Sequence, residues 1–338
     1  MAATIDVLIQ QNVSVGLFIF VICTFLPVML VTIIGNLIVI LSVYRKRSLA
    51  KTPNSIFISS LALFDFLNGL IGIPLCMVAY ILRRQFFYIE NCGIWYRVPA
   101  RIFVTISMLH LLVITIDRFL AIKYPLRYIV WMPVERAIRI CICVSFVGVF
   151  LGGIPSAVGA LASLLVPPPN VTYEYECRSS AFYDIYGNSV YFYLSAIIGL
   201  TIPIMFILYS YIFSVASKKA KEIATHHGKK VNRREMKVTK TAAIVLLVYT
   251  LCVAPTFLKS TIVHNAVDNG STWLVWFLWL ADFLILANSM INPLIYAGRS
   301  KEMRKEFKET FTTLFVRFNR IRSKRGERRA DISCVYVI

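Results

Sequence analysis

Long apolar stretches alternate along the chain with short segments that carry most of its charge. A helix that crosses the hydrocarbon core of a bilayer needs about 20 mostly apolar residues. Seven stretches meet this requirement: 16–44, 54–82, 93–118, 137–165, 188–217, 237–264 and 272–298. The pattern predicts an all-α membrane protein, a seven-transmembrane helix bundle that occupies residues 16–298.

The residues outside this bundle divide into two tails and one further helix. Between 299 and 318, apolar residues recur at steps of three and four with lysine and arginine between them. This is the pattern of an amphipathic helix that lies on a membrane surface. We therefore expect an extracellular tail over 1–15, a C-terminal amphipathic helix in contact with membrane lipids over 299–318, and a cytoplasmic tail over 319–338.

The composition excludes an ordinary soluble domain. Hydrophobic residues make up 58% of the chain and charged residues 16%, so a soluble fold would expose large apolar patches. The net charge of +19 is divided among four short segments, so we expect no nucleic-acid partner. Most of the 36 lysine and arginine residues fall on one side of the predicted spans. The positive-inside rule makes that side cytoplasmic, which predicts a multi-pass plasma-membrane protein with an extracellular N-terminus.

The cysteines and the glycosylation motifs agree with this orientation. Of the eight cysteines, only Cys92 and Cys177 fall in predicted outer loops, where the redox environment permits a disulfide. A bond between them ties the start of the third span to the loop before the fifth. Acceptor motifs for N-glycosylation occur on the same side of the membrane, at Asn12, Asn170 and Asn269.

Polar side chains interrupt the apolar stretches at a few positions. Ionisable groups inside a span are costly and usually have a function. Asp65 ends the sequence SLALFD in the second stretch, and Asp117 and Arg118 stand side by side at the end of the third. The seventh stretch contains NSMINPLIY, which adds Asn288, Ser289 and Asn292.

These residues form an ordered series of motifs. Gly35-Asn36, LALFD, DRF, TIPIM, CVAP and NPLIY occur in the first, second, third, fifth, sixth and seventh stretches. The series resembles the rhodopsin-like (class A) G-protein-coupled receptors over nearly the whole chain, about residues 16–316. The resemblance implies a receptor that binds an extracellular small molecule or short peptide and promotes nucleotide exchange on a heterotrimeric G protein.

The resemblance also implies a sodium site in the middle of the membrane. The matching residues are Asp65, Ser107, Asn288, Ser289 and Asn292. A lone buried carboxylate tends to become protonated or to recruit a cation, and hard cations prefer oxygen ligands. The alternative is a hydrogen-bonded polar core without an ion. No other metal and no other cofactor is expected, and sodium would act as an allosteric modulator.

A switch at the cytoplasmic boundary is implied in the same way. The resemblance gives Arg118 two acidic partners, Asp117 beside it and Glu235 on the sixth span, about 30 Å below Pro255. Tyr211 and Tyr296 match the positions that hold the open state. The alternative is an arginine that snorkels toward water and has no role in a switch. Segments 118–136 and 218–240 are expected to contact the G protein, and arrestin is a further candidate partner.

Two departures from the family pattern concern the sixth span and the third. The family usually has tryptophan in C-W-x-P, whereas this chain has Val253 between Cys252 and Ala254. Tyr249, further into the same span, is a candidate to carry part of the missing residue's role. Phe119 replaces the more usual tyrosine after Arg118.

The ligand is the part that the sequence determines least. Amine receptors of the family carry an aspartate in the third span where this chain has Ala100 or Pro99. One interpretation is an anionic ligand bound by Arg101 and Lys259, with Arg97 nearby. Another is a cation bound by Asp282 beside aromatic rings; those rings are Trp276, Phe277 and Trp279. In a third, Arg101 and Asp282 pair with each other and contact no ligand.

Two other classes of function compete with the receptor. A transporter or channel is the runner-up, but transporters often show inverted repeats and paired broken helices, and the seven stretches show neither. An enzyme is not expected, because His226 and His227 lack metal-ligand partners and no Ser-His-Asp set is apparent.

Overall fold

The structure is a computed structural model of the full chain. It describes residues 15–45, 52–81, 94–165, 193, 196–215, 217–218, 247–258, 272–299, 304–305, 308–313 and 316. Every regular element in these residues is helical.

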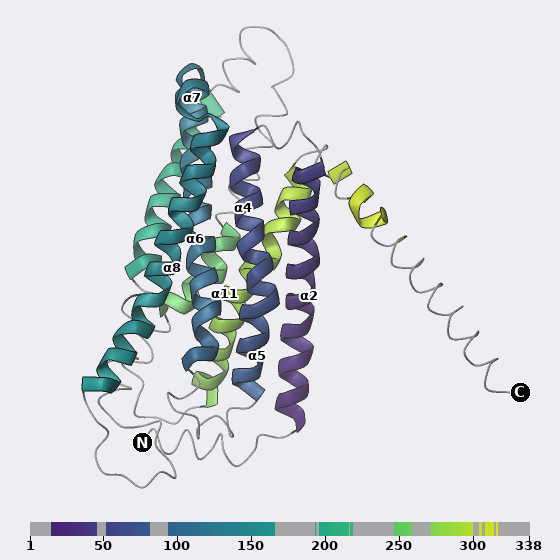
Figure 1. The fold of residues 1–338 in the computed structure, drawn as a ribbon, viewed down its shortest axis with the longest axis vertical. Helices are drawn as coiled ribbons and strands as arrows, with labels where there is room; N and C mark the ends of the chain where they lie inside the picture. Colours follow the sequence, from purple (N-terminus) through teal and green to yellow (C-terminus); the bar gives the residue numbers. More distant parts are fainter. Residues whose placement is uncertain are drawn as a thin grey trace, which may run out of the picture.

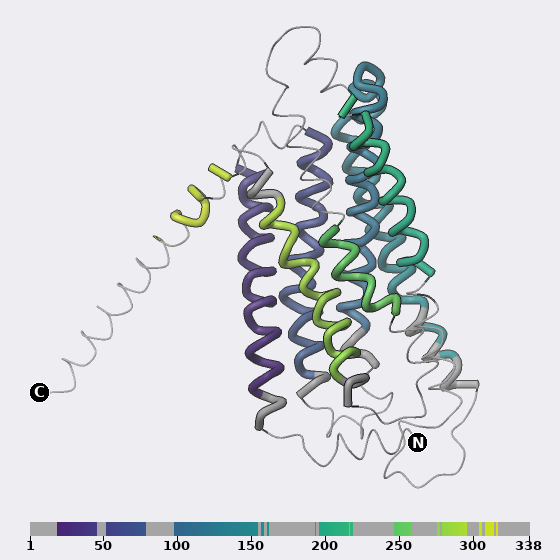
Figure 2. Tube along the Cα trace, turned by 180° about the vertical axis from the view of Figure 1, so that it is seen from behind, coloured from purple at the N-terminus to yellow at the C-terminus, as the bar shows by residue number. Residues whose placement is uncertain are grey.

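Long helices run side by side along the longest axis of the molecule (Figure 1). They are α2 (Val15–Arg45), α4 (Pro53–Leu67) with η1 (Asn68–Gly72) and α5 (Ile73–Ile81), α6 (Ile94–Lys123), α8 (Val134–Leu165) and α11 (Thr272–Arg299). The short helix α7 (Pro125–Trp131) lies at one end of the bundle. Two more helical segments, 196–215 and 247–258, lie on the side seen in Figure 2.

These helices correspond to the seven apolar stretches. Five described helices are long and apolar enough to cross a membrane, and 247–258 and 279–295 form shorter apolar helices. The expected all-α architecture is therefore confirmed. The third helix runs one turn beyond the predicted end at 118, to Lys123, because Phe119 and Ile122 pack against the core.

The second stretch is not one uninterrupted α-helix. Thr52 caps its N-terminus by accepting a hydrogen bond from the Ser55 N–H, and Pro53 follows in the first turn, where its missing N–H costs nothing. Five residues, Asn68–Gly72, then form a π-helical turn before α5 begins. The Ile73 N–H donates to the Asn68 carbonyl, five residues back. Such turns often mark functional sites.

Two glycines let α8 approach α6 closely. A Cβ atom on Gly152 would lie 2.7 Å from the Ile102 Cα, and one on Gly148 would lie 2.5 Å from the Ile106 Cγ1. Because the two glycines are four residues apart, they lie on the same face of α8. Small residues at such spacing are typical of helix contacts within membranes.

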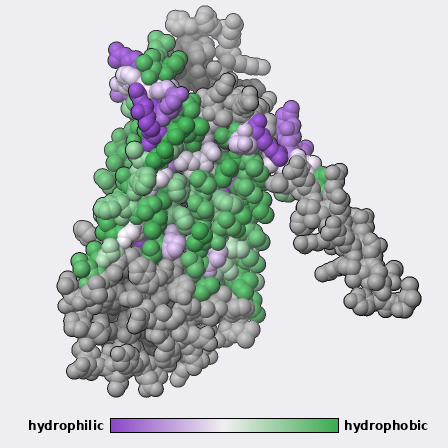
Figure 3. All heavy atoms as spheres, viewed as in Figure 1, coloured by the Kyte–Doolittle hydropathy of each residue, from purple (hydrophilic) through white to green (hydrophobic). Residues whose placement is uncertain are grey.

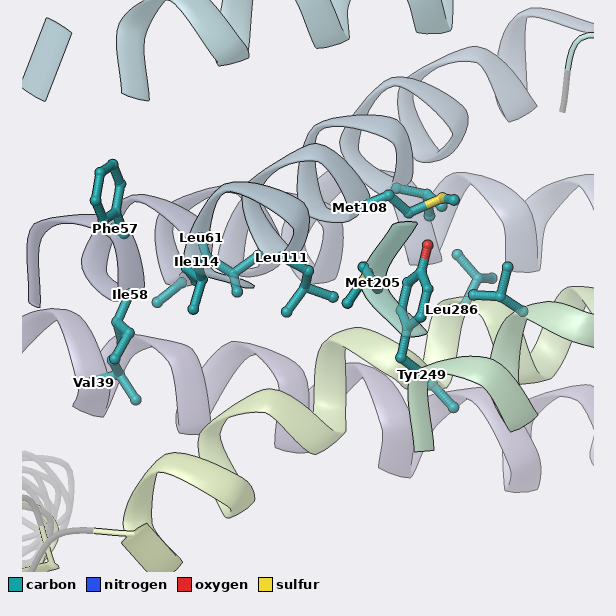
Figure 4. Packing of buried hydrophobic residues seen from close by; sticks show 14 of the residues in the cluster. Val39, Phe57, Ile58, Leu61, Met108, Leu111, Ile114, Met205, Tyr249 and Leu286 are labelled. Atoms are coloured by element: carbon teal, nitrogen blue, oxygen red, sulfur yellow. The ribbon is translucent and has the colours of Figure 1, made fainter. Parts of the chain in front are cut away.

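The outer surface of the bundle carries many large apolar side chains. Figure 3 shows hydrophobic residues over the visible lateral face and hydrophilic residues near the end that carries α7. On α8, large apolar side chains such as Phe146 and Phe150 are exposed, as expected for a helix that faces lipid. Inside, the buried Tyr249 ring stands between Met205 and Leu286 (Figure 4).

Candidate functional site

The first candidate region, which we call the polar core, is built around Ser289 in α11. Pro293 has no N–H, so the Ser289 carbonyl lacks its usual helical donor. The Asn36 amide of α2 takes that place, with its Nδ2 donating to the Ser289 carbonyl at 3.1 Å. Gly35 makes this approach possible, since a Cβ there would lie 3.1 Å from two carbons of Pro293. The Gly35-Asn36 and NPLIY motifs are therefore in contact.

The Asp65 carboxylate of α4 lies in the same polar core and is fully buried. Ser289 Oγ donates to its Oδ1 at 2.8 Å, and Asn292 Nδ2 donates to its Oδ2 at 2.7 Å. Asn68 Nδ2 in turn donates to Ser289 Oγ at 3.3 Å. Each carboxylate oxygen thus has a donor from α11, and the bonds join α4 and η1 to α11.

The polar core also contains oxygen atoms that these bonds do not use. Ser107 of α6 lies beside the Asp65 carboxylate. In the described part of the chain, Ser107 Oγ and the amide oxygens of Asn36 and Asn68 are buried without a hydrogen-bond partner. Asn288, which precedes Ser289 in the chain, is also buried. A buried carboxylate with the hydroxyl oxygens of Ser107 and Ser289 beside it fits a hard cation, so the residues of the implied sodium site are compatible with sodium.

The second candidate region, which we call the predicted switch, lies at the end of α6 that carries α7. The Asp117 side chain is 1% exposed and that of Arg118 22%. Arg118 donates to Asp117 Oδ2 from Nε at 2.9 Å and from Nη2 at 2.5 Å. Tyr128 of α7 donates from its hydroxyl to Asp117 Oδ1 at 2.5 Å. Asp117 therefore holds Arg118 with one oxygen and α7 with the other.

Sequence reasoning missed Tyr128. Burial raises the pKa of its phenol, the hydrogen bond and charge of Asp117 raise it further, and Arg118 lowers it. The phenol therefore stays protonated and remains a donor. Pro125 was the available signal, because it starts a second short helix that turns the chain back toward Asp117.

The other residues of the predicted switch lie in different places. Tyr211 packs edge to face against Phe119, with ring centroids 5.0 Å apart. The Lys123 ammonium lies 5.1 Å from the Phe119 ring centroid and 5.4 Å from that of Tyr211. Tyr209 points inward instead, and its hydroxyl accepts from Thr115 Oγ1 at 3.3 Å. Glu235 and the side chain of Tyr296 lie outside the described residues.

The ligand candidates do not form one cluster in the described residues. Arg101 Nε donates to the Gly152 carbonyl of α8 at 3.1 Å. The rings of Trp276 and Trp279 pack between α11 and α2, each against Phe20, with centroids 5.3 and 4.7 Å apart. Phe277 and Asp282 are partly buried on α11.

Several further predictions fall on residues that the structure does not describe. The Arg97 side chain and all of Lys259 lie outside the described residues, as do Cys92 and Cys177 and the sequons at Asn12, Asn170 and Asn269. The disulfide and the glycosylation stay predictions.

Comparisons with known proteins establish the class. The family model described as "7 transmembrane receptor (rhodopsin family)" matches residues 35–296. The histamine H2 receptor of Rattus norvegicus is 30% identical over 86% of this chain and 78% of its own length. The trace amine-associated receptor 2 of the same species is 32% identical over 79% and 77%. The adenosine receptor A2b of Gallus gallus is 28% identical over 86% and 88%.

The chain belongs to the rhodopsin family of seven-transmembrane receptors. It is a G-protein-coupled receptor for an extracellular ligand rather than an enzyme, and the comparisons give no support to a transporter or channel.

Proposed function

We propose that this receptor lies in the plasma membrane with its N-terminus outside and its α7 end in the cytoplasm. The basic residues support this orientation. Arg45, Lys123, Arg127 and Arg136 lie at or beyond the ends of helices on the side where α7 lies. Under the positive-inside rule this end faces the cytoplasm.

Control of Arg118 by Asp117 is the step that we propose regulates G-protein coupling. The observation that carries the proposal is the pair of hydrogen bonds from Arg118 to a carboxylate that is almost completely buried. A guanidinium held in this way cannot turn toward a partner at the cytoplasmic face. Ligand binding breaks these bonds and frees the guanidinium. Glu235 is the second acidic partner that the sequence predicts for Arg118.

The apolar face of α7 is the proposed contact for the G protein. Leu126 is 85% exposed, and Ile129 and Val130 are each 75% exposed. These side chains follow the third span, on the proposed cytoplasmic side of Arg118. An exposed apolar patch of this kind marks an interaction site. Its position beside Tyr128 couples the contact to Asp117.

A sodium ion in the polar core is the proposed modulator. Asp65, Ser107, Ser289, Asn288 and Asn292 would hold it, from α4, α6 and α11. When bound, it supplies a positive charge that compensates the carboxylate in a low-dielectric interior. The same residues already join α4 to α11 through the bonds to Asp65.

A small molecule is the proposed ligand. The relatives are named for histamine, trace amines, adenosine and octopamine. Ala100 and Pro99 offer no carboxylate in the third span. For a cationic ligand we therefore propose Asp282 of α11 as the anchoring residue.

The test compares ligand-free G-protein dissociation across the main Gα classes in cells, at matched surface expression. We expect Arg118→Ala to lower the resting signal. Tyr128→Phe should raise it, because Asp117 then loses the bond to α7 that fixes its carboxylate in position beside Arg118. Tyr124→Phe is the matched control, since Tyr124 has no bond to Asp117 among its described contacts. Equal signals from Tyr128→Phe and Tyr124→Phe would contradict the role given to Tyr128.

A further inference from the structure

Asn68 stands where the second helix changes its winding. It is the first residue of η1 and is fully buried. It follows Asp65 by three residues, so both side chains lie on one face of the helix. The π-helical turn begins directly after this pair.

The contacts of Asn68 determine the orientation of one hydroxyl group. Ser289 Oγ has one hydrogen and two lone pairs. Its hydrogen points to Asp65 Oδ1, at 2.8 Å, and Asn68 Nδ2 donates to one lone pair, at 3.3 Å. The second lone pair remains. Together the two neighbours favour one orientation of the hydroxyl, with its hydrogen toward Asp65 and its second lone pair in one direction.

The surrounding backbone fixes the amide itself. A Cβ on Gly72 would lie 2.2 Å from Asn68 Oδ1 and 2.9 Å from the Ala100 Cα. The missing side chain at Gly72 therefore provides the space that the amide oxygen occupies, and α6 closes the space from the other side. Asn68 is held in place by backbone rather than by flexible side chains.

The amide oxygen of Asn68 does not contribute to stability in this position. Asn68 Oδ1 has no hydrogen-bond partner among the described residues and is buried. A buried acceptor without a partner lowers stability. Packing alone therefore gives no reason for an amide at this position. The remaining purpose of the amide is its N–H donation to Ser289.

We propose that Asn68 is a positioning residue for sodium binding in the polar core. It orients the Ser289 hydroxyl so that the free lone pair of the hydroxyl and the Asp65 carboxylate face the same cation. It acts through Ser289 and does not contact the ion. This inference rests on the sodium site proposed above and adds to that site a residue from the π-helical turn.

The test measures the melting temperature of the purified full-length receptor as sodium chloride replaces choline chloride at constant ionic strength. In the wild type, the melting temperature should rise with sodium and reach a plateau. In Asp65→Asn the rise should disappear. In Asn68→Leu the sodium concentration for half the rise should increase about tenfold or more, the usual effect of losing a residue that orients a metal ligand. In choline alone, the difference in melting temperature between Asn68→Leu and the wild type gives the structural effect of the substitution, separate from sodium.

Asn54→Leu is the matched control. Asn54 lies in the first turn of the same helix, α4, and its amide oxygen is also buried without a partner in the described residues. It is far from Asp65, so its replacement should leave the sodium midpoint unchanged. Asn68→Ala is the second variant, in case leucine at this position prevents folding.

The outcomes separate the two proposals. An unchanged sodium midpoint in Asn68→Leu and Asn68→Ala, with Asp65→Asn insensitive, overturns the role of Asn68 and leaves the sodium site standing. A lower melting temperature of equal size in sodium and in choline, with the midpoint unchanged, makes Asn68 a merely structural residue. A wild type that does not respond to sodium removes the sodium site and the role of Asn68 together.

Discussion

The polar core and the predicted switch each surround one buried aspartate, but the donors to the two carboxylates come from different distances along the chain. Asp65 receives its donors from residues 224 and 227 positions away. Asp117 receives its donors from the next residue and from one 11 positions away. The first carboxylate joins helices that are distant in sequence, and the second closes a local loop between α6 and α7.

This difference suggests that the two regions have different roles in the bundle. Any movement of α11 relative to α4 must lengthen or break the bonds to Asp65. The bonds of Asp117 survive such a movement, because all their atoms belong to α6 and α7. The polar core is therefore sensitive to the arrangement of the helices. The switch can make or break its bond to Arg118 without a change in the contacts between α4 and α11. The predictions below test this comparison, beginning with the largest expected effect.

Removal of the carboxylate from the polar core should have the largest effect on stability. Asp65→Leu leaves the Ser289 hydroxyl and the Asn292 amide buried without an acceptor. Each unpaired group costs about 1–3 kcal/mol, so melting temperature and surface expression should both fall. Asp65→Asn is the control: its amide oxygen still accepts from Ser289, and the Asn292 amide can rotate to accept the new N–H. Equal losses in the two variants would show that the hydrogen bonds do not stabilise this region.

Much of this region could be predicted from the sequence, because its residues belong to motifs. Asp65, Ser289 and Asn292 occur in LALFD and NPLIY, and the structure brings them together. Asn68 could also have been predicted as part of this region, because a residue three positions after Asp65 shares its helix face. The π-helical turn was not, because hydrophobic composition alone does not distinguish a π-helical turn from an α-helix.

The switch was less predictable for a physical reason. Asp117 and Arg118 are adjacent in sequence, so their pairing was expected. Tyr128 reaches Asp117 only because the chain reverses at Tyr124 and Pro125. Hydrophobic periodicity predicts helices, but it does not give the direction in which a short loop helix returns.

A smaller loss of stability is expected at the contact between the first and seventh spans. Asn36→Leu removes the donor to the Ser289 carbonyl, which Pro293 has already deprived of its helical partner. Hydrogen bonds between membrane helices are worth about 0.6–2 kcal/mol, so the melting temperature should fall by a few degrees. Ser42→Ala is the control, because Ser42 is buried in α2 but bonds to the Ile38 carbonyl of its own helix. If Asn36→Leu and Ser42→Ala lower the melting temperature equally, the bond between the two helices contributes no more than a bond within one helix.

At the switch, signalling rather than stability should change. Asp117→Asn removes the charge that holds Arg118 but leaves an amide oxygen that can accept from Tyr128. We expect the ligand-free G-protein signal to rise several-fold while the melting temperature changes by less than in Asn36→Leu. Glu135→Gln, at an exposed acid in the first turn of α8, should change neither quantity. A large loss of stability in Asp117→Asn would mean that the switch is as structural as the polar core.

The smallest effect is expected at Lys123, which joins the switch to a neighbouring helix. Its ammonium lies about equally far from the rings of Phe119, Tyr124 and Tyr211, at 5.1, 5.1 and 5.4 Å from their centroids. Tyr211 belongs to the helix over 196–215, so this contact crosses between helices. A partly exposed cation–π contact is worth about 0.5–1 kcal/mol. Lys123→Gln should therefore lower the melting temperature slightly, and Lys123→Arg should restore it, because the guanidinium can also lie over aromatic rings. If arginine fails to restore it, the contact depends on the lysine's packing rather than on its charge. If glutamine lowers stability as much as Asn36→Leu does, the switch is tied to the rest of the bundle as firmly as the polar core, and the local character assigned to it is wrong.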